Sequence, residues 1–253
     1  MRTRVIPVLQ LQDGRLVKTR RFRQPVYIGD PINAVKIFND KEVDELIILD
    51  IGATALGRGP DLANLRRLAD EAFMPMAYGG GLANLADMQA VLKAGFEKLV
   101  LSTSALADPA LIGQAAAEFG SQSVVVSIDV ALRGLCHRRQ LVHGRGGTQI
   151  SRIRPVDHAR AMAAAGAGEI IISCIDRDGG MSGYDLELIR SIASAVSVPV
   201  VALGGAGCMQ DLADAAEAGA AGIAAGSMFV FHGPHRAVLI TYPERNALES
   251  LFP

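Results

Sequence analysis

The segment Ala202-Leu203-Gly204-Gly205-Ala206-Gly207 decides the fold, because an earlier segment, Ala77-Tyr78-Gly79-Gly80-Gly81, has the same form. Each is a short apolar run that ends in consecutive glycines and precedes a segment with helical character. Glycine adopts positive φ without strain and lets the backbone approach a bound group closely. One such loop is typical of any tight strand-to-helix turn, but two copies in one chain indicate an internal repeat.

Other landmarks recur in the same order around these loops. In each half a polar residue closes an early apolar run, an acidic residue precedes the glycine loop, and a small polar motif follows it. The matched segments are Val8–Leu11 with Ser127–Val130, Leu49–Ile51 with Cys174–Asp176, and Leu101–Thr103 with Ala225–Ser227. The members of each pair are separated by about half the chain. The sequence therefore predicts two similar halves that arose by internal duplication.

Short apolar runs alternate with helical segments along the whole chain. Unbroken apolar runs such as Leu46–Ile51 are typical of parallel strands that are buried on both faces. The predicted strands cover residues 5–11, 46–51, 74–78, 98–101, 123–128, 169–174, 199–203 and 222–225. The predicted helices cover residues 31–43, 61–71, 84–94, 108–119, 155–165, 186–195 and 209–218, with a last one within 229–252. This alternation predicts an α/β chain that forms one (β/α)8 barrel domain over residues 1–253.

Two basic stretches interrupt the alternation. Residues 15–30 contain Arg15, Lys18, Arg20, Arg21 and Arg23, and we expect a long mobile loop there. Such a loop is either a solvated surface segment or a lid that attracts anions over the barrel mouth. Residues 131–154 are also rich in arginine, and their pattern predicts a β-hairpin excursion.

Composition limits the functional classes. The chain has 253 residues, 50% of them hydrophobic, and a net charge of −1, which argues against a general nucleic-acid binder. Its three cysteines, Cys136, Cys174 and Cys208, have no metal-like spacing, so we expect a reduced cytoplasmic protein without metal or cofactor. No apolar stretch has the length of a signal peptide or a membrane span, and we expect neither.

Polar residues close several of the predicted strands. In barrels of this class the catalytic groups lie at the C-terminal ends of the strands, and this rule selects Gln10, Asp50, Asp129 and Asp176. Gln10 and Asp129 occupy equivalent places in the two halves, so they should face each other across the mouth. Two carboxylates there would form an acid–base pair, but an amide cannot exchange a proton at neutral pH. Asp129 is thus either catalytic or a loop-capping carboxylate, and for Asp50 a structural role is favoured.

The glycine loops predict where anions bind. Gly80 and Gly205 each belong to a loop with a hydroxyl-bearing segment beside it, Ser102-Thr103 and Gly226-Ser227 respectively. Backbone N–H groups and hydroxyls bind phosphate well, so we expect two phosphate sites and a ligand with a charged group at each end. Cys174 is expected on the same rim, but it has no evident histidine partner to make it a nucleophile.

Charged residues begin four of the strands at the opposite end of the barrel. They are Arg4, Glu45, Lys98 and Glu169. Two positive and two negative groups could form a closed ring of ion pairs that acts as a gate. The alternative is four solvated charges at strand starts.

At this point the chain resembles a known family, the cyclase subunit of imidazole glycerol phosphate synthase (HisF). The motifs that carry the resemblance are Arg4-Val5-Ile6-Pro7-Val8-Leu9, Asp13-Gly14-Arg15-Leu16-Val17-Lys18, Gly29-Asp30-Pro31, Asp44-Glu45-Leu46, Tyr78-Gly79-Gly80-Gly81, Ser127-Ile128-Asp129, Gly166-Ala167-Gly168-Glu169-Ile170, Ile175-Asp176-Arg177-Asp178-Gly179, Ser182-Gly183-Tyr184-Asp185 and Gly204-Gly205-Ala206-Gly207. The resemblance implies a (β/α)8 barrel of histidine biosynthesis with a glutaminase partner at its bottom. Ammonia would pass through the barrel to a bisphosphate substrate at the top.

The resemblance also implies roles for individual positions. The substrate and phosphate contacts would come from Lys18, Asp50, Gly80, Gly81, Ser102, Thr103, Asp178, Gly179, Gly205 and Ser227. The ammonia gate would consist of Arg4, Glu45, Lys98 and Glu169, and all four are retained, which favours a glutaminase partner.

Gln10 departs from the pattern, because the family has a catalytic aspartate opposite the one that Asp129 matches. The stretch from Lys18 to Phe38 also resembles a branch of paralogues found with surface-polysaccharide genes, which is thought to deliver ammonia for converting a sugar acetamido group to an acetamidino group. We expect this ammonia-delivering role first. The alternatives are a genuine histidine-biosynthesis cyclase, a related sugar isomerase, and a non-catalytic ammonia conduit.

Overall fold

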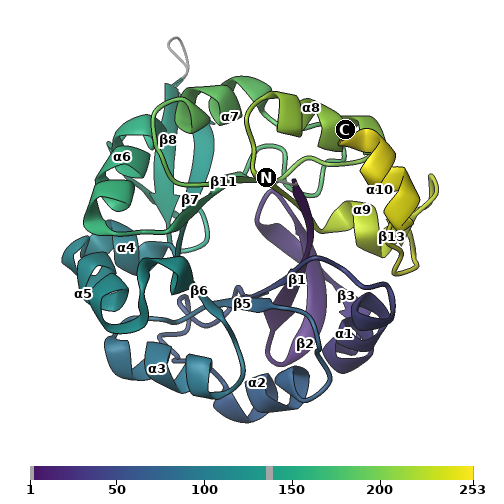
Figure 1. Ribbon diagram of the computed structural model, residues 1–253, viewed down its shortest axis with the longest axis horizontal. Coiled ribbons are helices and arrows are strands. Elements are labelled where there is room, and N and C mark those ends of the chain that lie inside the picture. Colours follow the sequence, from purple (N-terminus) through teal and green to yellow (C-terminus); the bar gives the residue numbers. More distant parts are fainter. Residues whose placement is uncertain (1–2, 135–138, 253) are drawn as a thin grey trace.

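A computed structural model of the chain describes residues 3–134 and 139–252. Within them, eight parallel strands close into a barrel. Figure 1 shows the ring of strands at the centre of the molecule. In chain order these strands are β1 (Arg4–Gln12), β4 (Leu46–Asp50), β5 (Met76–Gly79), β6 (Lys98–Leu101), β7 (Val124–Arg133), β10 (Glu169–Cys174), β11 (Val200–Leu203) and β12 (Gly222–Ala225). The pairing of β1 with β12 closes the ring, which confirms the predicted (β/α)8 barrel.

Helices surround the barrel and cover the outer face of the strands (Figure 1). The long ones are α1 (Pro31–Asp40), α2 (Leu62–Ala69), α3 (Leu85–Lys93), α5 (Ala110–Phe119), α6 (Pro155–Ala165), α7 (Leu186–Ala193), α8 (Met209–Glu217) and α10 (Arg245–Leu251). Asp30 caps α1: its side chain accepts a hydrogen bond of 3.3 Å from Asn33 N, and Pro31 occupies the first turn.

Shorter elements complete the described chain. They are α4 (Thr103–Ala107), α9 (Ser227–Val230), a 3₁₀ turn at Ser121–Ser123, and the small antiparallel pair β13 (Phe231–His232) and β14 (Ala237–Val238). None of the described helices has the length and apolar character that crossing a membrane would require.

The barrel interior is layered along its axis. Side chains alternate between the two faces of each strand, so every second residue points inward. The inward apolar residues form a cluster of their own: Ile6, Val8, Ile47, Ala77, Val100, Val125, Ile171, Val201 and Ala224. Charged residues lie below this cluster, and polar residues lie above it at the C-terminal ends of the strands. The axis therefore leads from a charged base through an apolar middle to a polar mouth.

Residues 15–29 form a hairpin of two paired strands, so the expectation of an irregular loop was wrong. Strands β2 (Arg15–Arg20) and β3 (Arg23–Gly29) pair antiparallel with each other, and β2 continues the sheet alongside β1. Leu16, Val17 and Ile28 are buried beneath the hairpin. These apolar residues stabilise the hairpin, and its many arginines had concealed that pattern.

The second basic stretch is a hairpin excursion, as predicted. β7 extends beyond the barrel and pairs with β8 (Arg139–Gly144), which pairs with β9 (Gln149–Ile150). Cys136 and Arg138, which belong to this stretch, lie outside the described residues.

Candidate functional site

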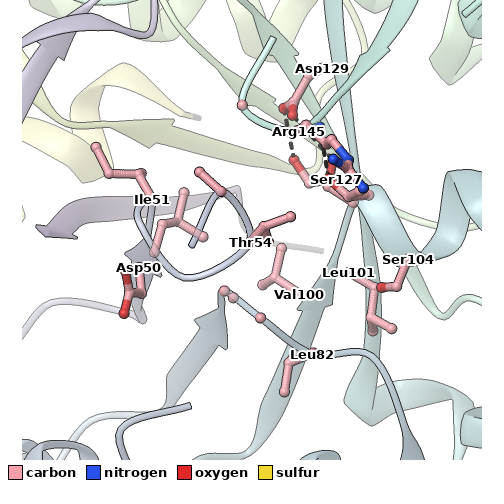
Figure 2. Close-up of a pocket in the computed structure, with 18 of the residues that line it drawn as sticks. Asp50, Ile51, Thr54, Leu82, Val100, Leu101, Ser104, Ser127, Asp129 and Arg145 are labelled. Atoms are coloured by element: carbon pink, nitrogen blue, oxygen red, sulfur yellow. Dashed lines mark hydrogen bonds between the residues drawn. The ribbon is translucent and has the colours of Figure 1, made fainter. Parts of the chain in front are cut away.

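A cavity of about 710 Å³ opens at the C-terminal ends of the strands, where barrel enzymes carry their active sites. The structure brings many of the predicted site residues together in its lining: Gln10, Lys18, Asp50, Gly80, Gly81, Ser102, Thr103, Asp129 and Asp178. Three others, Gly179, Gly205 and Ser227, are not among the lining residues. Figure 2 shows Asp129, Ser127 and Arg145 on one side of the cavity, with Asp50 and Ile51 on the opposite side.

Asp129 is a buried carboxylate at the cavity wall, with 8% of its surface exposed. Its Oδ2 accepts a hydrogen bond of 3.1 Å from Ser102 Oγ, and Ser127 Oγ lies 3.5 Å from its Oδ1. Burial raises the pKa of Asp129 to about 7, although both hydroxyl groups act in the opposite direction. A group with such a pKa is able to accept and donate protons at neutral pH, as acid–base catalysis requires.

Gln10 lies on β1, at the position that corresponds to Asp129 in the other half of the barrel, and is 5% exposed. Its Oε1 accepts a hydrogen bond of 3.0 Å from Thr19 N, and Thr19 Oγ1 lies 3.2 Å from the same oxygen. The amide therefore connects the barrel wall to the hairpin β2–β3. It offers the cavity hydrogen bonding but no titrating group.

The two glycine loops pack against backbone in the same way. Gly81 has a φ of 66°, and a Cβ there would collide with the carbonyl oxygen of Arg58. Gly205 has a φ of 126°, and a Cβ there would collide with the carbonyl oxygen of Gly183. Glycine is thus required by close packing between loops in both halves. Phosphate binding by these loops stays a prediction.

The hydroxyls beside the first glycine loop already have partners. Ser102 Oγ donates to Asp129, and Thr103 Oγ1 accepts a hydrogen bond of 2.9 Å from Arg145 N. The latter contact joins the second hairpin to the start of α4. Arg58 and Arg145 also line this part of the cavity and supply positive charge.

Lys18 covers the predicted second phosphate site. Its Nζ occupies the space that a Cβ on Gly226 would need, and burial lowers the pKa of Lys18, against the opposing effect of Asp178. Ser227 Oγ is buried there without a hydrogen-bond partner among the described residues. A Cβ on Gly179 would collide with the carbonyl oxygen of Thr19. The hairpin therefore closes over this half of the mouth.

Asp50 and Asp176 both accept hydrogen bonds from backbone N–H groups. Asp50 Oδ1 accepts hydrogen bonds from Gly52 N at 3.0 Å and Ala53 N at 3.1 Å, and burial raises the pKa of Asp50. Asp176 Oδ2 accepts a hydrogen bond of 2.7 Å from Leu132 N and does not line the cavity. These contacts favour the structural interpretation of both residues.

Cys174 does not line the cavity, which corrects its expected place on the rim. Its neighbour Ser173 faces the cavity instead, because successive side chains of β10 point to opposite faces. Burial raises the pKa of the Cys174 thiol to about 11, so it is protonated at neutral pH.

The four charges at the base of the barrel form a closed ring. Arg4 pairs with both Glu45 and Glu169, and Lys98 Nζ lies 2.9 Å from both Glu45 oxygens and 3.0 Å from Glu169 Oε2. Both glutamates are buried. The alternative of four separately solvated charges is therefore wrong, and the ring covers the lower end of the apolar interior.

Several residues that line the cavity were not predicted from the sequence, among them Thr19, Phe22 and Arg145. Thr19 and Phe22 reach the cavity because the hairpin folds over the mouth, and Arg145 reaches it through the second excursion. No local pattern marks them. Only the basic character of both stretches indicated a role near an anion.

The closed barrel, the cavity at its mouth and a buried carboxylate with near-neutral pKa define a (β/α)8-barrel enzyme. The profile of the family described as "Histidine biosynthesis protein" matches residues 4–235. A Pseudomonas aeruginosa protein provisionally named imidazole glycerol phosphate synthase subunit hisF2 is 49% identical over 98% of this chain and 99% of its own. A provisionally named HisF subunit from Leptospira interrogans is 47% identical over 100% of this chain and 99% of its own, and the imidazole glycerol phosphate synthase subunit HisF of Hyphomonas neptunium is 42% identical over 91% of each. The chain belongs to the histidine biosynthesis protein family and is a HisF-like subunit.

Proposed function

We propose that this chain is a cyclase-type barrel subunit that takes ammonia from a glutaminase at its base and passes it to an acceptor at its mouth. In this proposal it supplies ammonia for converting a sugar acetamido group to an acetamidino group, a reaction completed on a third protein. The observation that carries the proposal is Gln10. Gln10 occupies the position that matches Asp129 in the other half of the barrel, and its amide oxygen accepts a hydrogen bond from Thr19 N. One of the two expected acidic residues is therefore absent.

The base of the barrel supports the glutaminase partner. Arg4, Glu45, Lys98 and Glu169 form a ring across the lower end, and the apolar cluster above it includes the small residues Ala77 and Ala224. Neutral ammonia crosses an apolar interior at a lower desolvation cost than ammonium. A ring that opens on docking would therefore admit ammonia and exclude ions.

The mouth supports an anionic acceptor. Residues 15–29 and 131–154 contain no Asp or Glu, although the whole chain has a net charge of −1. The two hairpins meet over the cavity, since a Cβ on Gly147 would contact the Phe22 ring at 3.4 Å. Their exposed arginines make one positive rim, which attracts an anionic ligand or the acidic face of an acceptor protein.

The second candidate is the histidine-biosynthesis cyclase itself. Asp129 favours it, because its pKa of about 7 suits proton transfer, and the names of the relatives fit it equally. Under this candidate Asp129 alone would serve as the acid–base group.

A turnover assay with ammonium salt separates the two candidates, because free ammonium removes the need for a glutaminase. The purified chain is given the bisphosphate substrate of the imidazole glycerol phosphate synthase cyclase, with Asp129→Asn as the control. We expect no turnover by the native chain. Turnover that disappears in Asp129→Asn would establish the cyclase and overturn the ammonia-delivering role.

A reconstituted amidation reaction tests whether the chain delivers ammonia from the glutaminase to the sugar. An acetamido sugar, ATP to activate the amide oxygen that leaves, glutamine, a glutaminase subunit, this chain and a sugar amidotransferase are combined. The acetamidino product is measured by mass spectrometry. We expect glutamine-dependent product only when this chain is present. Equal product from glutamine without the chain would contradict the proposal.

A further inference from the structure

The tip of the hairpin β2–β3 holds a backbone conformation that residues with a Cβ rarely adopt. Arg21, Phe22 and Gln24 have φ values of 53°, 59° and 52°. Left-handed conformations are unfavourable for such residues and persist where surrounding contacts determine the backbone. The contacts that hold this hairpin closed should therefore be identifiable.

Asp178 supplies the first set of contacts, from the loop after β10. Its carbonyl oxygen accepts a hydrogen bond of 3.0 Å from Arg21 N. Its Oδ2 lies 3.3 Å from Phe22 N and 2.9 Å from Thr19 Oγ1. The Asp178 carboxylate thus binds the backbone of the tip at Phe22 and the buried side chain of Thr19.

Gln10 supplies the second set, from the barrel wall. The N–H of Thr19 requires an acceptor, so the amide oxygen of Gln10 faces the hairpin. Thr19 Oγ1 lies between this oxygen and Asp178 Oδ2. Gln10, Thr19 and Asp178 are all buried, so a lost partner would leave polar atoms without water.

We propose that Gln10 is a positioning residue that holds the hairpin β2–β3 closed through Thr19. Gln10 therefore leaves the mouth without a second acidic group, and its contact with Thr19, which we call the latch, holds the hairpin in place. With the hairpin closed, Lys18 stays against Gly226, beside Ser227 Oγ, which has no hydrogen-bond partner in the part of the chain that the structure describes. Among the described residues that line the cavity, the first glycine loop is represented and the second is not. A ligand that needs the second glycine loop must release Gln10 from Thr19.

An aspartate at position 10 would not replace this latch. Its side chain is one methylene shorter, so its oxygens would not reach Thr19 N from the same backbone position. Its negative charge would also lie near Asp178, with only the Thr19 hydroxyl between the two groups. Two like charges at that range repel each other. Gln10→Asp therefore changes both the chemistry of the mouth and the position of the hairpin.

Limited digestion with trypsin tests the latch without any substrate, so its outcome is independent of the proposed function. Trypsin cuts after Arg20, Arg21 and Arg23 when the hairpin opens, and mass spectrometry quantifies those cuts. Because cleavage follows the population of the open state, we expect Gln10→Leu to raise the rate about tenfold. Gln10→Asp should raise it as well.

Matched variants separate the latch from a general loss of stability. Gln12→Leu makes the same change on the same strand, at a side chain without a hydrogen bond among the described residues, and should leave the rate unchanged. Thr19→Val should open the hairpin and Thr19→Ser should not, because serine keeps the hydroxyl. The double variant Gln10→Leu with Thr19→Val should cleave more slowly than the product of the two single effects would give, because both changes remove the contact between Gln10 Oε1 and Thr19 Oγ1.

A Gln10→Leu rate equal to that of the native chain would overturn the proposal. If this variant does not fold, hydrogen exchange of the native chain decides the question. The Thr19 amide, bonded to Gln10, should exchange at least tenfold more slowly than that of Gln24 at the hairpin tip. Equal exchange at the two amides would also overturn the latch.

Discussion

Ser102 Oγ donates a hydrogen bond of 3.1 Å to Asp129 Oδ2, which joins the end of β6 to the buried carboxylate of β7. Burial alone favours the protonated acid, whereas this hydroxyl favours the charged form. The balance places the pKa of Asp129 at about 7, where it serves as an acid or a base at neutral pH.

Removing the Ser102 hydroxyl should raise the pKa of Asp129 further. A hydrogen bond to a charged group contributes about 1.5 kcal/mol, so Ser102→Ala should raise this pKa by about one unit. Carboxyl carbon NMR titration measures it directly. Ser104→Ala is the control, because Ser104 lines the same cavity without bonding Asp129. An unchanged pKa in Ser102→Ala would show that the hydroxyl does not act on the carboxylate.

Asp129 should also make stability depend on pH. Its pKa is raised on folding from about 3.9, so the folded state binds more protons between about pH 4 and pH 7, and stability falls as the pH rises through that window. Relative to Asp129→Asn, the native chain should lose about 2 kcal/mol of unfolding free energy between pH 5 and pH 8. Urea denaturation at both pH values measures this difference, and parallel profiles would contradict it.

The ring at the base should be sensitive to loss of one cation. Lys98→Met leaves Glu45 and Glu169 buried with one partner fewer, which should cost about 3 kcal/mol of unfolding free energy. Lys36→Met is the matched control, because the exposed Lys36–Glu71 pair at 3.3 Å should contribute less than about 1 kcal/mol. Denaturation in urea compares them, and equal effects would mean that burial of the ring is unimportant.

Two glycines allow the energetic cost of close packing to be measured separately from the cost of a left-handed backbone. Gly81 and Gly57 have similar φ values of 66° and 63°, but nothing lies within 4 Å of a Cβ on Gly57. Gly57→Ala should cost only the left-handed penalty of about 1 kcal/mol, whereas Gly81→Ala adds a collision with Arg58 and should cost at least about 1 kcal/mol more. Thermal unfolding of both variants measures this difference. Equal costs would show that the loop relaxes around the added methyl group.

Local patterns in the sequence predicted much of the barrel. Unbroken apolar runs identified the strands, and their alternation with helical segments identified the barrel. The hairpin β2–β3 was missed because its apolar residues are few and its arginines are typical of a solvated loop. Its stability depends on β1 alongside it and on Asp178, which lies far away in the sequence.

The sequence by itself determined the closed barrel and some of the polar residues that close its strands at the mouth, Gln10 and Asp129 among them. Strand periodicity and repeated glycine loops are local properties, and the C-terminal ends of parallel strands meet at one edge wherever such a barrel forms. Only the tertiary structure decided what those residues do. The pKa of Asp129, the ring around Lys98 and the contact between Gln10 and Thr19 all depend on distances and burial, which the linear order of residues does not specify.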